Sequence, residues 1–454
     1  MTQPEPALSV EQLRAQVRDG EVDTVVVAFP DMQGRLQGKR MHAQFFLDTV
    51  LEHGTEGCNY LLAVDIDMNT VDGYAISSWE RGYGDMQMTP DFSTLHPVPW
   101  LPGTAMVIAD LGWLDAGHSP VLESPRQILR TQADRAAAMG FTALAGTELE
   151  FIVFNDSYEH AWTNAYRGLT PANQYNVDYS LIGTSRVEPL LRDIRNGMYS
   201  AGLVVESAKG ECQLGQHEIA FKYDEVVRTA DKHSVYKTGA KEIAAQHGQA
   251  ITFMAKFDAR EGNSCHIHMS LRGTDGRIVF DEGDGATPLF DSFVAGIQAT
   301  LREMTLLYAP NINSYKRFQP GSFAPTSTAW GHDNRTCSLR VVGHGAGLRL
   351  ENRLPGGDVN PYLALAGMLA SGLRGVEQEL PLEPPYTGNA YLSDHPKVPA
   401  TLREARDLFA GSTIAREALG DAVVDHYLNN ADVELAAYDA AVTDWERFRS
   451  FERM

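Results

Sequence analysis

The residues best suited to chemistry in this sequence lie two positions apart, the spacing that places side chains on one face of a β-strand. In the segment 146–154, Glu148 and Glu150 share one face, whereas Leu149 and Phe151 share the opposite, apolar face. Two neighbouring carboxylates repel each other unless a cation lies between them. The pattern therefore indicates a cation site, and its alternative is a solvated strand with two ordinary surface glutamates.

A second segment, 265–271, places His266, His268 and Ser270 on one strand face. A His-x-His pair on a strand is a common arrangement for binding a metal or a phosphate. Two core histidines with ordinary hydrogen-bond partners would give the same pattern, so the sequence leaves both interpretations open.

A third segment, 348–354, places Glu351 between Arg349 and Arg353 on one face. A salt-bridge ladder is the simpler interpretation of this pattern. The same three side chains would also suit a site that holds a metal next to an anionic substrate and phosphates.

More charged residues occupy predicted loops or strands, namely Glu206, Glu211, Glu218, Arg317, Arg335 and Arg340. Carboxylate oxygens are the ligands that hard divalent ions such as Mg²⁺ or Mn²⁺ prefer. Two such ions beside an arginine cluster would neutralise phosphates and the charge that develops between them, so these residues together predict phosphoryl transfer. The glycine-rich segment 343–347 adds little, because a hairpin connection explains its glycines equally well.

The elements that must position these residues alternate along the later part of the chain. Apolar periodicity predicts strands near 146–154, 203–206, 217–222, 251–257, 265–271, 338–342 and 348–354. It predicts helices near 187–201, 225–247, 288–308 and 361–380, followed by a mainly helical C-terminal region. A further helix is expected from a capping box at 124–127 to about Met139, with Gly140 ending it.

The first part of the chain is predicted to be a smaller, strand-rich unit, with a helix at 8–19 and strands at 22–29, 58–64 and 105–111. A passage with prolines between 97 and 125 is the best candidate for a domain boundary. The 454 residues suggest two or three domains.

Composition excludes several classes of protein. The formal net charge of −21 argues against non-specific binding to nucleic acid or to anionic membranes. The 4 cysteines lie far apart, which excludes a disulfide framework or a thiolate zinc site. We see no signal peptide and no apolar run of about 18 residues, so a cytoplasmic location is expected.

Taken in chain order, these segments resemble the glutamine synthetase superfamily across nearly the whole sequence. The matching motifs are 148–150, Glu211 with 215–218, 266–268 with Ser270, 313–317, 334–335 with Arg340, and 349–353. The resemblance implies an α+β fold, with an N-terminal β-grasp domain in residues 1–117 and a catalytic domain in 118–454 that has an antiparallel sheet with surrounding helices. It also implies a homo-oligomer, usually a dodecamer of two stacked hexamers, with active sites between neighbouring subunits.

The resemblance also implies a role for each matching residue. One divalent metal would be held by Glu150, Glu211 and Glu218, and a second by Glu148, His266 and Glu351. L-glutamate would be bound by His266, Arg317, Arg353 and the backbone near Gly262. The transferred phosphate would contact Arg335 and Arg340, which form the catalytic set with Glu351. ATP would be bound by Glu206, Tyr223, His268, Ser270, Arg340 and Arg349.

The implied reaction has two steps: ATP phosphorylates the γ-carboxylate of glutamate, and an amine then attacks the acyl phosphate. Ammonia-using members carry a glutamate, in the loop that corresponds to 320–325, that helps to bind and deprotonate ammonium. Phe323 occupies that position in this sequence. Phenylalanine cannot accept a proton, and it offers apolar surface to an alkyl chain. We therefore expect an ATP-dependent ligase that joins glutamate to a small primary amine, with ethanolamine as the first choice and a polyamine as the second.

Two alternatives remain open. One is an ammonia-using glutamine synthetase in which another side chain replaces the missing base, and the other is a non-catalytic structural or nitrogen-sensing relative. A polyamine would in addition need an anionic subsite for its distal ammonium, for which the candidates are Asp67, Tyr175 and Asp178.

Overall fold

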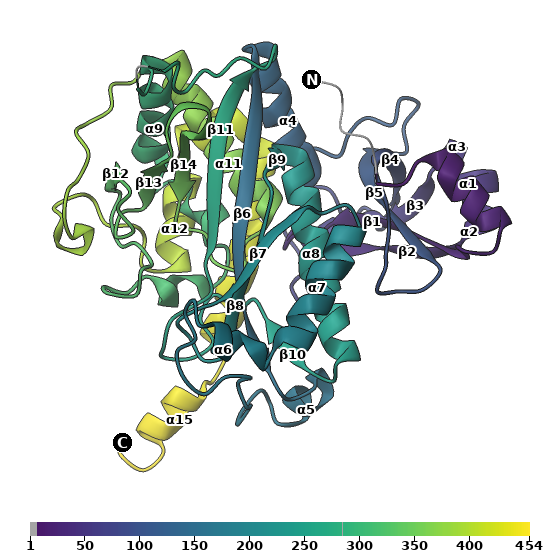
Figure 1. Cartoon of the computed structure of the whole chain (residues 1–454), viewed down its shortest axis with the longest axis horizontal. Helices are drawn as coiled ribbons and strands as arrows, with labels where there is room; N and C mark the ends of the chain where they lie inside the picture. Colours follow the sequence, from purple (N-terminus) through teal and green to yellow (C-terminus); the bar gives the residue numbers. More distant parts are fainter. Residues whose placement is uncertain (1–6, 284) are drawn as a thin grey trace.

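Two sheets of different size organise the chain (Figure 1). The computed structural model describes residues 7–283 and 285–454. A 5-stranded sheet lies in the N-terminal part, and a 9-stranded sheet with most of the helices makes up the rest.

The smaller sheet has the strand order β2-β1-β5-β4-β3, and its two central strands, β1 and β5, are parallel. Its strands are β1 Thr24–Pro30, β2 Leu36–His42, β3 Thr55–Cys58, β4 Asp85–Pro97 and β5 Thr104–Trp113. Helix α1 (Val10–Arg18) and the helical stretch of α2 (Ala43–Phe45), a π-helical turn (Phe46–Val50) and α3 (Leu51–His53) accompany it. A mixed sheet with a parallel central pair is the arrangement expected of a β-grasp domain.

Strand β1 packs on both of its faces, which joins the smaller sheet to the rest of the molecule. Val25 and Val27 point into the core of the smaller unit. Val26 and Ala28 belong instead to the large core that includes β6 (Phe141–Phe154). A domain boundary at 117/118 stays a prediction, although β5 ends at Trp113 and the next helix begins at Pro125.

The larger sheet has the strand order β12-β13-β14-β11-β6-β8-β7, with β9 and β10 also paired to β6. Its other strands are β7 Val205–Gly210, β8 Gln216–Phe221, β9 Asp224–Glu225, β10 Ala250–Thr252, β11 Cys265–Gly273, β12 Trp330–His332, β13 Leu339–Val342 and β14 Arg349–Asn352. Its pairings are antiparallel, as expected, except for the parallel pair β12–β13. The glycine-rich segment 343–347 is the connection between the antiparallel strands β13 and β14, as the hairpin interpretation predicted.

Helices flank this sheet (Figure 1), and α11 lies almost wholly in the core. They are α4 Pro125–Ala138, α5 Tyr158–Thr163, α6 Leu181–Ser185, α7 Glu188–Ser200, α8 Val226–Gln246, α9 Pro288–Thr300, α10 Thr305–Tyr308, α11 Pro361–Glu377, α12 Leu402–Ala410, α13 Thr413–Leu419, α14 Asp421–Ala440 and α15 Asp444–Ser450. The short helix α15 projects from the body and exposes Trp445 and Phe448, and Phe451 directly after it is exposed as well.

Several sequence predictions in the N-terminal part were wrong or incomplete. The strand expected at 58–64 ends at Cys58, and a 3-10 turn (Asn59–Leu62) follows it. The side chain of Asn59 explains the turn, because it donates to the carbonyl of Ile76 and accepts from Ser77. Strands β2 and β4 were not predicted; β2 is a largely exposed edge strand without the apolar alternation that identifies a strand.

Three predictions in the C-terminal part also needed correction. The helix expected at 288–308 is interrupted after Thr300, whose hydroxyl donates to the carbonyl of Gly296, a contact that bends helices. The strand expected at 251–257 ends at Thr252, because the side-chain amide of Asn263 donates to the backbone carbonyl of Thr252. The capping box at 124–127 does not form, because the Ser124 N–H donates to the carbonyl of Val121 and the Ser124 side chain makes no cap hydrogen bond.

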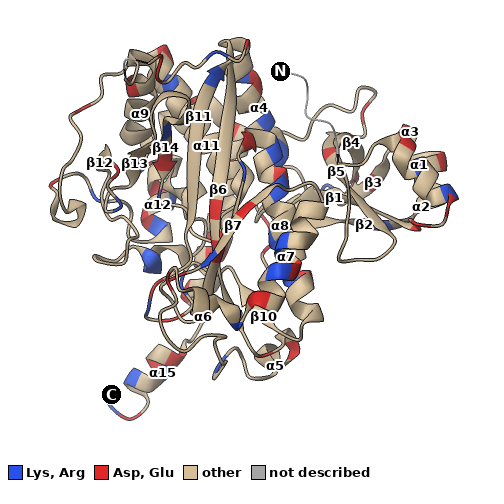
Figure 2. Cartoon of the chain, viewed as in Figure 1, with Lys and Arg blue, Asp and Glu red and all other residues tan. Residues whose placement is uncertain are grey.

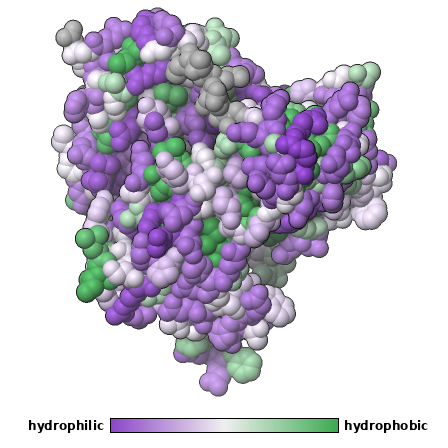
Figure 3. Space-filling model, turned by 45° about the vertical axis from the view of Figure 1, so that its right-hand side comes forward, coloured by the Kyte–Doolittle hydropathy of each residue, from purple (hydrophilic) through white to green (hydrophobic). Residues whose placement is uncertain are grey.

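The surface is mostly polar. The face in Figure 3 is largely hydrophilic, with separate small hydrophobic patches. Within 7–283 and 285–454, the helices are too short or too polar to cross a membrane.

Candidate active site

The register of the larger sheet brings the chemical residues of three separate segments onto one surface. His266 on β11 lies directly opposite Glu148 on β6, and Glu218 on β8 lies opposite Glu150. Glu351 on β14 lies opposite His268. Directly opposite residues in a sheet share a face, with Cβ atoms about 5 Å apart. Strand β6 therefore carries the centre of the site, and Figure 2 marks its acidic positions together with basic positions on neighbouring segments.

One cluster of carboxylates is formed by Glu150, Glu211 and Glu218, whose oxygens lie within 4.8 Å of one another. Glu150 and Glu218 are buried. Burial, together with the negative charge of Glu148 and Glu150, raises the pKa of Glu218 well above its usual range, although Lys209 lies 3.4 Å away. Lys209 thus offsets only part of the negative charge, so the donor set fits a divalent cation.

The side chain of Glu150 is held in place by neutral donors. Gln216 donates to Oε2 of Glu150 at 2.9 Å, and the backbone N–H of Ser264 donates to the same oxygen at 2.7 Å. Both contacts are made to Oε2, and they orient the carboxylate of Glu150 toward the cluster.

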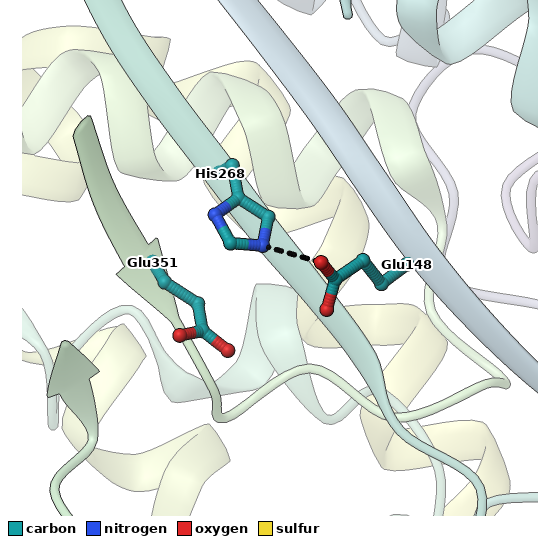
Figure 4. Close-up of side chains that lie close together, drawn as sticks. All are labelled: Glu148, His268 and Glu351. Carbon is teal, nitrogen blue, oxygen red and sulfur yellow. Dashed lines mark ion pairs between the residues drawn. The ribbon is translucent and has the colours of Figure 1, made fainter. Parts of the chain in front are cut away.

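A second cluster combines carboxylates with histidines (Figure 4). Ligand atoms of Glu148, His268 and Glu351 lie within 4.8 Å of one another, and His268 Nε2 is 3.0 Å from Glu148 Oε1. The sequence prediction for this metal used His266. Its Nδ1 lies 3.5 Å from an oxygen of Glu148 and 3.5 Å from an oxygen of Glu351. Both histidines thus lie beside the two carboxylates.

Glu351 is completely buried between two arginines. Arg340 Nη1 lies 2.9 Å from its Oε2, and Arg353 Nη1 lies 2.5 Å from its Oε1. Burial alone would raise the pKa of Glu351, but the charges of His266, Arg353 and neighbouring groups lower it to about 2. The carboxylate is therefore ionised at neutral pH and fixes both guanidinium groups.

Three adjoining cavities, of about 280, 530 and 300 Å³, cover this surface. Glu148 lines all three of them. The first is lined by residues predicted for ATP, namely Glu206, Tyr223, His268, Ser270 and Arg349. Arg335 and Arg340 line both of the others, and the third also contains the carboxylates of the first cluster, Gly262, Arg353 and Phe323. The three cavities therefore meet at Glu148, in the middle of strand β6.

Of the predicted site residues, Arg317, Asp67 and Tyr175 do not line these three cavities. Arg317 is fully buried, and its guanidinium donates to the backbone carbonyls of Arg353 and Leu354. Arg317 thereby fixes the chain that carries Arg353, and direct contact with glutamate stays a prediction.

Several residues of the third cavity were not identified from the sequence as site residues. They are Tyr179, Lys209, Cys212 and Glu261. Asp178, which lines the same cavity, was considered only as a distal subsite. Lys209 lies near the end of strand β7, two positions before Glu211, and that spacing could have indicated it. Tyr179 and Glu261 come from loops, where no periodicity indicates which way a side chain points.

Comparison with known proteins places this geometry in a family. Residues 122–450 match the family model of the glutamine synthetase catalytic domain. The γ-glutamylethanolamide synthetase GlnA4 of Streptomyces coelicolor is 68% identical over 99% of this chain and 97% of that protein. The glutamate–isopropylamine ligase of a Pseudomonas species is 37% identical over 96% of this chain and 97% of that protein.

A solved structure of GmaS in complex with ADP shares the fold. Its TM-score is 0.85 and its identity 26%, over 97% of this chain and 99% of that one. The shared sheet, the carboxylate clusters on it and the two close relatives agree with the resemblance seen in the motifs. The chain therefore belongs to the glutamine synthetase family.

Proposed function

We propose that this protein joins the γ-carboxylate of L-glutamate to ethanolamine in an ATP-dependent reaction. The observation that favours an amine over ammonia is Phe323, which lines the cavity of the carboxylate cluster without offering a proton acceptor. The choice of ethanolamine is supported by the 68% identity to a γ-glutamylethanolamide synthetase.

Each step of this reaction has residues suited to it. In the first step, an oxygen of the γ-carboxylate attacks the terminal phosphorus of ATP, and ADP leaves. In the second, the ammonium form of the amine loses a proton to solvent, and the neutral nitrogen attacks the carbonyl carbon of the acyl phosphate. Phosphate then leaves, and the nitrogen loses a second proton as the amide forms. Arg335 and Arg340 line both the middle cavity and the third, so they are placed to bind the phosphoryl group in transit. Glu351 keeps Arg340 in that position.

We assign two divalent ions, Mg²⁺ or Mn²⁺, to the two clusters. Glu150, Glu211 and Glu218 would hold one, and Glu148 and Glu351 would hold the other with His266. Bound there, the ions would neutralise the phosphates and polarise the transferred phosphoryl group. The glutamate substrate would have its α-carboxylate at Arg353, beside the backbone of Gly262.

The proposal extends to assembly and location. A homo-oligomer, a dodecamer of two stacked hexamers, follows from the family resemblance, and the exposed aromatic residues of α15 are compatible with contacts between subunits. Mass photometry of the purified protein tests it. A cytoplasmic location is proposed as well, and cell fractionation tests that.

The decisive experiment measures phosphate release with ATP, Mg²⁺ and glutamate while one amine is added at a time. The panel contains ammonium, methylamine, ethanolamine, putrescine, cadaverine and spermidine, and mass spectrometry identifies each product. We expect ethanolamine to give the highest kcat/KM. A preference for diamines would favour a polyamine ligase, whereas a strong preference for ammonium would contradict our interpretation of Phe323. Absence of glutamate-dependent phosphate release with every amine would favour a non-catalytic relative.

A further inference from the structure

Two aromatic side chains face the third cavity from opposite loops. Tyr179 is 71% exposed and Phe323 is 55% exposed, and both line the cavity beside the carboxylate cluster. Most other groups on its wall are charged. Large exposed rings in a charged cavity offer apolar surface that the metals, phosphates and glutamate of the proposed reaction do not need.

Two carboxylates of the same cavity also have no role in the proposed reaction so far, namely Asp178 and Glu261. Asp178 lies beside the first cluster, because a carboxylate oxygen of Asp178, one of Glu211 and Sγ of Cys212 lie within 4.8 Å of one another. The Cys212 thiol is 3.6 Å from Oδ2 of Asp178.

No basic group in the described part of the chain forms an ion pair with Asp178, whereas the charge of Glu261 interacts with that of Lys256. Lys209 is paired with Glu211 and Glu218. A sulfur ligand suits a hard divalent ion poorly, which argues against a third metal at Asp178.

A carboxylate next to aromatic faces is the combination that binds organic ammonium ions. Tyr179 already accepts a cation at its ring, since Nζ of Lys209 lies 5.1 Å from the ring centroid. The amine substrate of the proposed reaction is an alkylammonium ion in neutral solution.

Building on the proposed function, we propose that Asp178 binds the ammonium group of the incoming amine, and that Tyr179 and Phe323 enclose its short alkyl chain. In this arrangement Asp178 supplies the negative charge that Phe323 does not, from a different loop. The subsite favours primary alkylamines, because Asp178 holds the ammonium group and the two rings offer apolar surface to the alkyl chain.

The test compares D178N with wild type and with E159Q, which changes an exposed glutamate on helix α5 that is not part of the cavity wall. Steady-state constants are measured with ethanolamine, with ethylamine and with hydroxylamine. Hydroxylamine is uncharged at neutral pH and therefore does not need a carboxylate to hold it.

For D178N we expect KM for ethanolamine and for ethylamine to rise about 10- to 100-fold, the loss typical of a hydrogen bond to a charged group. KM for glutamate, KM for ATP and the rate with hydroxylamine should change less than about twofold, as should all constants of E159Q. A higher KM for ethanolamine alone would place Asp178 beside the hydroxyl group of ethanolamine and overturn the assignment. Equal loss with hydroxylamine, or a higher KM for glutamate, would overturn it as well.

A second pair of variants tests the aromatic wall without altering charge. Y179A should raise KM for ethylamine about 10-fold, whereas Y179F, which keeps the ring, should retain the wild-type KM within about twofold. The same KM for ethylamine in Y179A and Y179F would contradict the role of the Tyr179 ring in enclosing the alkyl chain. If the wild-type protein makes the hydroxamate from hydroxylamine but no product from any alkylamine, both the subsite and the proposed amine substrate are overturned. If D178N leaves the turnover of alkylamines intact, the subsite alone is overturned.

Discussion

Nη1 of Arg340 on β13 lies 2.9 Å from Oε2 of Glu351, which stands directly opposite it on β14. The sequence suggested a salt-bridge ladder of Arg349, Glu351 and Arg353. Arg353 does pair with Glu351, but the second partner is Arg340, and Arg349 donates to His268 instead. This ion-pair ladder does not compete with the functional interpretation, because Arg340 lines two of the three cavities. The ladder is the means by which the phosphate-binding groups are kept in position.

The first prediction concerns Glu351. In E351Q the two arginines lose a charged partner, and the second cluster loses a ligand. We expect phosphate release to fall at least about 100-fold, a loss similar to that of other preorganised charge-stabilising groups. Breaking a buried ion pair should also lower the free energy of unfolding by about 3 kcal/mol. Urea unfolding measures this, and E377Q, which removes a surface partner of Arg135, should cost less than about 1 kcal/mol.

The second prediction concerns metal binding by the first cluster. The pKa of Glu218 is raised by burial and by its carboxylate neighbours, so a proton is held there at neutral pH without a metal. A metal ion must displace that proton, and Mg²⁺ binding should release protons at pH 7. The number of protons released is measured by calorimetric titrations with Mg²⁺ in buffers of different ionisation enthalpy. E218Q should abolish the release, and an unchanged count in E218Q would contradict the prediction.

The third prediction concerns amine choice. F323E places a carboxylate at the position of the expected ammonium acceptor, so kcat/KM for ammonium should rise about 10-fold or more and that for ethanolamine should fall. F323L serves as the control, because it removes the ring without adding charge, and it should not gain activity with ammonium. A gain in F323L equal to that in F323E would mean that space, and not charge, excludes ammonium.

The fourth prediction concerns acid stability where β4 meets α4. Burial would raise the pKa of Asp91, but Arg126, 2.7 Å away, and hydrogen bonds from Ser93 lower it from 3.8 to about 2. Because the pKa in the folded state is lower than in the unfolded state, ionised Asp91 stabilises the fold above about pH 4, and this stabilisation is lost as the pH falls toward 2. The shift corresponds to about 2 kcal/mol. The difference in unfolding free energy between wild type and D91N should shrink by that amount across this range; a constant difference would contradict it.

The fifth prediction concerns Gly262 on the wall of the third cavity. A Cβ at this position would lie 2.1 Å from the carbonyl oxygen of Ala255 and 2.6 Å from Cγ of Arg317. G262A must therefore displace the loop, and we expect KM for glutamate to rise about 10-fold and the free energy of unfolding to fall by about 1–3 kcal/mol. G84A, where a Cβ meets nothing within 4 Å, should leave both values unchanged.

The parts of the site that strands carry were predictable from the sequence. Glu148, Glu150, His266 and Glu351 follow the period of two, and that period also determines which side chains share a face. The choice between His266 and His268 was not predictable, because both project from the same face and only the position of the ring nitrogens distinguishes them.

The parts that were missed lack a local signal. Strand β2 has no apolar alternation, because it lies at a sheet edge with most of its residues exposed. Tyr179 reaches the cavity from a loop whose path depends on contacts with distant segments, such as the bond from its N–H to the carbonyl of Gly210. Such contacts are a property of the folded chain and cannot be read from neighbouring residues.

The residues of the site come from two kinds of segment, strands and loops. Strand residues supply both ligand clusters except Glu211, which follows β7, whereas loops supply Asp178, Tyr179, Glu261 and Phe323. Strand positions are tied to their neighbours through the hydrogen-bonded register, so a change there disturbs several sites at once. Loop positions carry no such constraint. On this fold, substitutions in two or three loops can therefore change which amine is accepted. The strand residues that activate the carboxylate of glutamate can stay the same.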